Sequence, residues 1–571
     1  MSYLPHLSLR ALAALCALAL TLNLAACDRD DDDAEAEDDA AQEVTEERPD
    51  ELNADHSSLL ETYGSQFGPG DDLLVTLAPL NSLSQLADHI DAPDFFNDVG
   101  PEIEAALGFN IFDADSIANA GVELDSSMVV SEVMDSPIYC VTVADADTFD
   151  DRIGETLEVV VESDEELSRD TTEIDGQDVH HFGEAVAWIH RYDDTCVIQQ
   201  AYDSPPPAPE ALESFLGAID DGNRYSDSDT FNAFVGSDAT DGLITVYSED
   251  DAFLNEMTAG LPPQAQGMVQ GMSDGQAGRL ALSDDVLGIR VWSHAEGPMA
   301  AMASELMQSD ADVDWAPFVT DELSAALRLS LHGPTLMGMA EDAINDMMGA
   351  MAAEFMASMP EGVQDEADAD GDEVRFSDDM RDLITGHAAL FFYDLDDPTA
   401  AMADPEGFAH AEALVAIQLG QPDMVRDMIG EFEPMLGEFG AEMRPLHTDD
   451  GEHDGIHVIA GDAVPAWIAL SDDLLIIAPR GLSEEGLAAM IDNGNGAVAD
   501  SKLGDVLLDD QFNGIYATSG LWSVLDATSE EPTLQDQLDE GRLTLQAGDD
   551  SFHIDIDATP AGGLLSLIME L

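Results

Sequence analysis

Four sequence landmarks occur twice in this chain, in the same order, and this repetition constrains the fold more than any other feature. The spacing between copies is 279 residues at the tryptophans (188 and 467) and 263 at the Gly-Arg-Leu motifs (278 and 541). Between them lie two Ile-Asp-Asp/Asn-Gly-Asn turns, ending at Asn223 and Asn495, and two short strand-like runs beginning near Asp241 and Asn513. A long-range repeat of this kind predicts two copies of one folding unit. We place them at residues 70–305 and 315–571.

The pattern inside each unit is predominantly that of β-hairpins. Residues 279–292 (RLALSDDVLGIRVW) and 542–557 (RLTLQAGDDSFHIDID) alternate apolar and polar positions around acidic and glycine turns. Residues 209–219 and 483–491 have helical periodicity instead. Since no regular β-α-β alternation is present, we expect an α+β fold with mostly antiparallel sheets and packed helices.

The N-terminal segment predicts export and anchoring. Residues 11–24 form an apolar run of signal-peptide length, too short to span a membrane, which takes about 20 apolar residues. The following Leu24-Ala25-Ala26-Cys27 resembles the lipobox of bacterial lipoproteins. The resemblance implies that residues 1–26 are a signal peptide and that Cys27 carries the lipid. The alternative is an ordinary signal peptide with a chance cysteine, and Asp28 leaves open which membrane holds the protein.

Residues 27–69 begin with a dense run of like charge, DRDDDDAEAEDD, which is typical of a disordered, self-repelling linker. We predict a lipidated cysteine followed by an acidic tether that holds the body outside the cytoplasm. The body loosely resembles uncharacterised periplasmic repeat lipoproteins, and that resemblance implies no activity.

The charge balance is extreme, with 121 acidic against 17 basic residues and a formal net charge of −104. Repulsion of this size destabilises a compact chain in dilute buffer, whereas about 1 M salt shortens the Debye length to roughly 3 Å. The composition therefore favours a halophilic source. The alternatives are neutralisation by cations such as calcium or by a basic partner. Nucleic acid is excluded as a partner, because its phosphates would be repelled.

Four cysteines are present. Cys16 leaves with the signal peptide and Cys27 is assigned to the lipid. Cys140 and Cys196 remain, both in apolar β-type runs and in a compartment that permits oxidation. We predict a disulfide between them, with two buried thiols as the alternative.

Two fragments match catalytic or metal motifs only in part. Gly271-Met-Ser-Asp-Gly275 fits G-x-S-x-G but precedes a strand, whereas a nucleophile elbow needs a helix after its serine. Asp368 and Asp370 lie at alternate positions before Gly371, as in a calcium loop, but the twelfth position is Ser377 instead of a bidentate carboxylate. The fragment thus predicts at most a partial site for calcium or another divalent cation, and a solvated linker is the alternative.

His447, His453 and His457 lie among acidic residues and are a further weak candidate for a divalent metal. His180, His181 and His190 occupy roughly the corresponding part of the first unit. The spacing matches no zinc signature, and the setting looks like a polar hairpin, which is the alternative.

A methionine-rich run at 334–359 has a broad apolar face at helical spacing. Its candidate ligand-facing residues are Met337, Met339, Met347, Met348, Met351, Phe355 and Met356. Methionine adapts to varied apolar surfaces, so the run favours a groove for an apolar ligand or partner helix. The alternative is a helix that packs in the core.

The two units share structural landmarks and no polar triad. This favours a non-catalytic binding or scaffold role toward an apolar ligand, an envelope component or a protein partner. The alternative is a metal-dependent or hydrolytic envelope enzyme with a site between the units.

Overall fold

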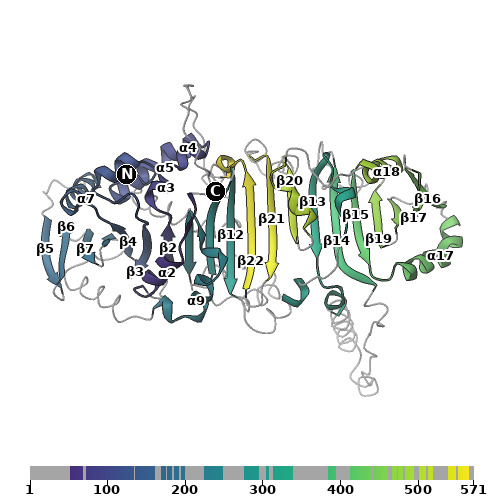
Figure 1. Ribbon diagram of the computed structural model, residues 1–571, viewed down its shortest axis with the longest axis horizontal. Helices are drawn as coiled ribbons and strands as arrows, with labels where there is room; N and C mark the ends of the chain where they lie inside the picture. Colours follow the sequence, from purple (N-terminus) through teal and green to yellow (C-terminus); the bar gives the residue numbers. More distant parts are fainter. Residues whose placement is uncertain are drawn as a thin grey trace, which may run out of the picture. The chain divides into compact units, whose positions relative to one another are not determined.

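The computed structural model in Figure 1 describes most of the chain from residue 52 onward. The described ranges are 52–67, 73–133, 136–160, 169–174, 177–182, 186–191, 194–199, 224–248, 276–283, 285–294, 304–307, 313–338, 383–393, 412–438, 442–448, 451–460, 466–471, 473–479, 482–493, 501–509, 512–518, 538–547 and 551–564.

The chain divides into two compact units, each built of helices and antiparallel strands. The first comprises Met1–Ala300 and Asp550–Leu571, and the second comprises Ala301–Asp549. The predicted combination of helices with a large antiparallel sheet is confirmed. The hairpin predicted at 279–292 is present as β11 (Gln276–Ser283) and β12 (Val286–His294), and the helix predicted at 483–491 as α18 (Glu484–Asn493). The helix predicted at 209–219 lies outside the described residues.

The boundary predicted for the second unit needs correction at its C-terminal end. Strand β22 (Ser551–Thr559) pairs along its length with β12 and therefore belongs to the first unit. Arg290 and Asp555 face each other across this pair, with Nε–Oδ1 at 2.5 Å and Nη2–Oδ2 at 3.0 Å. A bidentate pair of this geometry is directional as well as attractive, and it helps to set the register of the last strand.

Apart from β1 and β9, which pair with each other, the described strands of the first unit form one antiparallel series. Its pairing order is β5-β6-β7-β8-β4-β3-β2-β10-β11-β12-β22. The strands not yet defined are β1 (Ala54–Asp55), β2 (Leu73–Leu77), β3 (Val129–Val133), β4 (Ser136–Thr142), β5 (Arg169–Ile174), β6 (Gln177–Phe182), β7 (Val186–Arg191), β8 (Asp194–Gln199), β9 (Asp241–Gly242) and β10 (Ile244–Ser248).

Helices cover both faces of this series. One face packs on α2 (Ser57–Gly64), η2 (Tyr225–Asp227) and α9 (Asp229–Val235), which contribute Leu60, Tyr225 and Phe231 to a large buried cluster. The other face packs on α5 (Pro93–Leu107) and α7 (Ala146–Val160), and Tyr139 of β4 donates to the Leu107 carbonyl at 3.1 Å. Shorter helices are α3 (Leu80–Leu83), α4 (Leu86–His89), α6 (Ala114–Asn119) and η3 (Asp238–Thr240).

Helix α5 shows how the sequence sets these elements. Pro93 begins the helix, where its missing N–H costs nothing, and Gly108 ends it with φ at 85°, in the left-handed region. Val99, Ile103 and Leu107 recur every four residues and are all buried. The helix thus presents one apolar stripe to the sheet.

The tether predicted at 27–69 also needs correction, because residues 52–67 are part of the first unit. Strand β1 pairs with β9, and Asn53 exchanges two hydrogen bonds with the backbone of Leu282, at 2.8 and 3.1 Å. His56 is buried, and its Nε2 lies 2.9 Å from the Gly242 carbonyl oxygen. These contacts give a short polar segment enough partners to become ordered.

Acid is expected to loosen this N-terminal attachment. Burial holds the pKa of His56 below its ordinary value of 6.5, so the folded state favours the neutral ring. The stability that depends on neutral His56 is therefore complete above about pH 6.5 and is lost as pH falls below it. We expect the difference in unfolding free energy between wild type and His56→Gln to shrink between about pH 7.5 and 5, by at most about 1.4 kcal/mol per unit of pKa lowering.

Urea titrations of both proteins at each pH measure this difference. Protonation of the many carboxylates affects both proteins alike and cancels. A difference that stays constant across the range would contradict the assignment.

The strands of the second unit pair in the order β16-β17-β18-β19-β15-β14-β13-β20-β21, again antiparallel throughout. They are β13 (Leu323–Ser330), β14 (Ile384–Tyr393), β15 (Ala413–Leu419), β16 (Glu442–Thr448), β17 (Gly451–Ala460), β18 (Ala466–Leu470), β19 (Leu474–Pro479), β20 (Gly514–Thr518) and β21 (Glu540–Ala547). The helices are η4 (Ala316–Phe318), α17 (Pro422–Glu438), α18 and η6 (Gly504–Leu508).

One face of the second unit carries its core. Phe318 stacks on Phe391 with ring centroids 5.8 Å apart, and the Tyr393 hydroxyl donates to the Phe318 carbonyl at 2.8 Å. Leu487 of α18 and Leu507 of η6 are buried as well. Among the helices that the structure describes in either unit, none is long and apolar enough to cross a membrane.

Candidate functional site

Most of the side chains singled out in the sequence lie outside the described residues. These are Cys27, Met339, Met347, Met348, Met351, Phe355, Met356, Asp368, Asp370 and the Gly271–Gly275 motif. Met337 is described and is half-buried shortly after β13. The ligand groove and the calcium loop therefore stay predictions.

Cys140 and Cys196 lie directly opposite each other in the β4–β8 pair and form a disulfide with an S–S distance of 2.05 Å. Both belong to the buried cluster beneath α2 and α9. The bond therefore fastens two neighbouring strands inside the core of the first unit.

The three histidines of the second unit are spread along one hairpin. His447 pairs with Glu452 across β16 and β17, whereas His457 pairs with Pro445 and, on its other side, with Leu470. His453 and His457 are four residues apart on one strand, which separates their Cα atoms by about 13 Å. The backbone thus does not gather the three at one point, and their side chains are outside the description.

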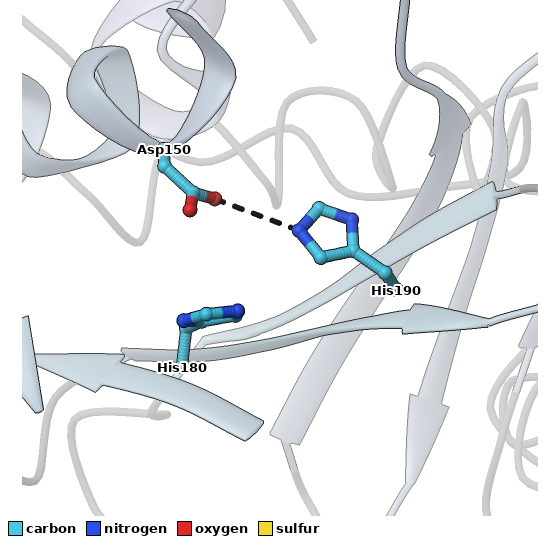
Figure 2. Close-up of side chains that lie close together, drawn as sticks. All are labelled: Asp150, His180 and His190. Atoms are coloured by element: carbon cyan, nitrogen blue, oxygen red, sulfur yellow. Dashed lines mark ion pairs between the residues drawn. The ribbon is translucent and has the colours of Figure 1, made fainter. Parts of the chain in front are cut away.

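In the first unit, by contrast, two histidines meet a buried aspartate. On β7, Trp188 and His190 are two residues apart and face the same side of the sheet, and His180 of β6 lies opposite Trp188. Above them, α7 places Asp150 on the buried face that also carries Phe149 and Ile153. Figure 2 shows Asp150 reaching from the helix toward the two imidazoles on the strands.

The ligand-type atoms of Asp150, His180 and His190 all lie within 4.8 Å of one another. Asp150 Oδ1 is 3.8 Å from His190 Nε2, and the two imidazoles meet edge to face with centroids 5.6 Å apart. Asp150 is only 4% exposed, whereas the His190 side chain is 36% exposed. The group therefore has a fixed inner end and an outer end open to solvent.

Surrounding polar groups fix the orientation of all three side chains. Trp188 donates its indole N–H to Asp150 Oδ1 at 2.5 Å, and its ring stacks on His180. Thr195 Oγ1 lies 2.7 Å from His190 Nδ1, and Thr171 Oγ1 lies 3.2 Å from His180 Nδ1. Hydrogen bonds of this kind hold imidazole rings in place and favour one tautomer.

Sequence reasoning noticed the histidines but missed Asp150. In a chain with 121 acidic residues, a single aspartate carries little signal. The one available signal was position, because Asp150 shares the apolar face of a helical segment with Phe149 and Ile153. An acidic residue on such a face needs a polar partner once buried.

A second candidate surface is apolar and lies in the second unit. Cross-strand pairing brings six aliphatic residues into one row over β20, β13, β14, β15, β19 and β18. We call Ile515, Leu327, Leu390, Val415, Ile477 and Ile468 the apolar row. Ile515 is 42% exposed and Leu327 is 37% exposed, and the other four are half-buried. An exposed apolar row across a sheet is unusual and marks a candidate binding surface.

A polar depression of about 510 Å³ lies beside α5, α6 and α7. Half of its lining residues are acidic, and Arg152 lies among the carboxylates. Arg152 donates to Glu104 at 2.5 Å and to the Gly108 carbonyl at 2.6 Å. This arginine therefore fastens α7 to α5, which makes the depression part of the helix packing.

No protein-family model matches the chain, and no curated protein matches it either. Crystal forms of TP0453 are similar to parts of it. Form I is 10% identical over 41% of this chain and 78% of that chain, with a TM-score of 0.23. Form III is 11% identical over 44% and 89%, with a TM-score of 0.22, and form IV is 12% identical over 40% and 79%, with a TM-score of 0.23. TM-scores this low establish neither a common fold nor a common function.

Proposed function

We propose that this chain is a lipid-anchored envelope protein of a halophilic bacterium with a non-catalytic role, and that it binds an apolar ligand. The apolar run that ends in Leu24-Ala25-Ala26-Cys27 supports the anchor. Residues 28–51 would then be the spacer, with a reach of roughly 25–30 Å for a flexible chain and more where its charges repel.

We further infer that the two units are copies of one ancestral unit. Each strand from β2 to β11 on the pairing path of the first unit has a counterpart in the same place in the second, from β13 to β21. Helix α7 follows β4 as α17 follows β15, and both lead into a hairpin. A ladder of nine strands has many alternative orders, so this agreement supports duplication.

Pairing register gives a different match for one of the repeated landmarks, the two tryptophans. The β7–β8 hairpin of the first unit can be aligned with the β18–β19 hairpin of the second by superimposing their turns. In that alignment Trp188 corresponds to Ile468, which is one residue away from Trp467. A shift of one residue reverses the face of a strand. Accordingly Trp188 donates to Asp150 of α7, whereas Trp467 donates to the Leu482 carbonyl beside α18, at 2.7 Å.

The observation that carries the proposal is a difference between the two units at equivalent positions. The same register matches the apolar row to Val246, Val75, Val130, Tyr139, Val197 and Trp188 in the first unit. Every one of these six is at most 9% exposed, and α5 and α7 contact two of them, Tyr139 and Trp188. The apolar row offers aliphatic side chains on a surface that its counterpart buries.

The size of the apolar row suits an acyl chain. Six strands about 4.8 Å apart give a row of about 24 Å, longer than the roughly 15 Å half-thickness of a bilayer's hydrocarbon core. Each methylene moved from water onto such a surface contributes up to about 0.8 kcal/mol. A single extended hydrocarbon chain lying across the strands fits this length and chemistry.

Binding of a fluorescent fatty-acid analogue tests the proposal. We expect the double variant Leu327→Thr/Ile515→Thr to bind it about tenfold more weakly than wild type, since two half-covered aliphatic contacts are lost, on the order of 1.4 kcal/mol. Threonine keeps strand propensity, so the fold should persist. Leu508→Thr, an equally exposed leucine of η6 outside the apolar row, is the matched control.

The rival occupant of the apolar row is the chain's own segment 339–382, which is part of the connection between β13 and β14. Replacing that segment by a glycine-serine linker distinguishes the two. If wild type binds the fatty-acid analogue and the linker variant binds it equally well, the result supports the ligand site. Binding that appears only after the replacement would assign the row to the segment and overturn the proposal.

Salt dependence tests the halophilic origin. With 121 acidic and 17 basic residues, most carboxylates have no cation to pair with, and salt must screen them. We expect the melting temperature to rise by on the order of 10 °C between about 0.05 and 3 M sodium chloride. Circular dichroism in sodium and choline chloride separates screening from specific sodium binding. A flat melting temperature would contradict salt adaptation.

A further inference from the structure

We propose that Asp150, His180 and His190 form a divalent transition-metal site in the first unit, with a donor set that suits Zn²⁺. The site is separate from the apolar row and does not depend on the proposed function. Two imidazoles and one carboxylate are a recurrent donor set for Zn²⁺ with an open position.

The distances are close to those a bound ion requires. Tetrahedral zinc has bonds of about 2.0–2.1 Å to nitrogen and oxygen, which places neighbouring donors about 3.3 Å apart. Asp150 Oδ1 and His190 Nε2 are 3.8 Å apart, and all three ligand atoms fall within 4.8 Å. Small side-chain rotations therefore suffice to bring them onto one ion, with no movement of α7 or the strands.

The residues that hydrogen-bond to the three candidate ligands are of the kind that orient ligands in metal sites. A ligating histidine commonly donates its second ring N–H to an oxygen, which orients the ring and raises its basicity. The buried Thr195 Oγ1 is the oxygen that His190 Nδ1 meets, and this leaves His190 Nε2 turned toward Asp150. Trp188 donates to the carboxylate from the other side. Three side chains aimed at one point are thus supported before any ion arrives.

The partial exposure of His190 gives an ion access to the site and leaves room for a further ligand. The His190 side chain is 36% exposed, so an ion can enter past it and keep a water molecule. The nitrogen donors favour borderline ions such as Zn²⁺ over Ca²⁺, which prefers six to eight oxygens. The acidic surface attracts any cation. Among the described residues, however, this is the group in which imidazole nitrogens and a carboxylate lie close enough together to hold one ion.

The second unit provides an internal comparison. Register places Ile459 level with His180 and Leu470 level with His190, and the start of α17 places Arg426 level with Asp150. None of these three can ligate a metal as the first unit can. The proposal therefore predicts one site per chain, not two.

Titration of the chelator-treated full chain with Zn²⁺ in 1 M sodium chloride tests the site, because that salt suppresses association with surface carboxylates. We expect one tight site per chain in calorimetry. His190→Ala and Asp150→Asn should each weaken it at least 100-fold. The amide that Asp150→Asn introduces keeps an oxygen for the Trp188 N–H, so this variant should fold even where an alanine would not. His181→Ala, one residue from His180 on the same strand, is the matched control and should bind as wild type does.

Zinc X-ray absorption then counts the imidazoles, and two per ion are expected. Retained binding in His190→Ala, loss in His181→Ala, or absorption without imidazole would each overturn the assignment. The assignment would also be overturned if wild type and variants alike showed only several weak sites that disappear at 1 M salt. Such sites would be association of Zn²⁺ with the protein surface only.

Discussion

Replacement of Cys27 by serine is expected to move the whole protein from the membrane fraction to the soluble fraction. The resemblance of Leu24-Ala25-Ala26-Cys27 to a lipobox is the basis for assigning the lipid to this thiol, and two or three acyl chains hold a protein stably on a bilayer. The acidic segment that follows is repelled by anionic headgroups and cannot replace the anchor. Fractionation with immunoblotting, together with labelled palmitate, measures the change.

Cys16→Ser is the control for the membrane experiment, since that cysteine lies within the predicted signal peptide. It should leave labelling and fractionation as they are in wild type. Persistence of the Cys27→Ser variant in the membrane fraction, or its continued labelling, would place the anchor elsewhere. The proposed envelope location would then have no support from the sequence.

Loss of the Cys140–Cys196 disulfide is expected to cause a large fall in the stability of the first unit. The bond joins residues 56 apart, and closing a loop of that length removes about 4 kcal/mol of chain entropy from the unfolded state. We expect the double variant Cys140→Ser/Cys196→Ser to lose roughly that much unfolding free energy. The corresponding fall in melting temperature is on the order of 10 °C.

Urea unfolding of the two proteins, with and without reductant, measures the disulfide effect. Reduced wild type should match the double variant in reductant, and the variant itself should not respond to reductant. Two titratable thiols in the untreated, denatured wild type would show that the bond does not form. The contribution of the pair would then be that of two small buried side chains.

Local patterns predicted much of the secondary structure because local physics determines it. The alternation in residues 279–292 produces the β11–β12 hairpin, and the periodicity of residues 483–491 produces α18. The boundaries were less well predicted, because an end depends on distant partners. Residues 52–67 become ordered through β9 and Leu282, and β22 joins the first unit through β12.

The side of the sheet that a residue faces, and the residues that it meets there, depend on the register between paired strands. The sequence of a single strand does not encode that register. Trp188 and Trp467 look equivalent in sequence, yet Trp188 donates to Asp150 of α7 and Trp467 donates to the Leu482 carbonyl beside α18. Cys140 could be a free thiol or half of a disulfide until the β4–β8 pairing placed Cys196 opposite it. The apolar row likewise exists only because six strands align six separate residues.

The sequence by itself determined the repeated landmarks, the class of the fold, the extreme acidity and the predicted anchor, because each of these depends on composition or on short-range patterns. Only the tertiary structure brought Asp150 of a helix to within 3.8 Å of His190 on a strand, and only it aligned the six aliphatic residues of the apolar row and left Leu327 and Ile515 exposed. Those features arise from contacts between residues far apart in the chain, and their free energy depends on packing that no single segment specifies.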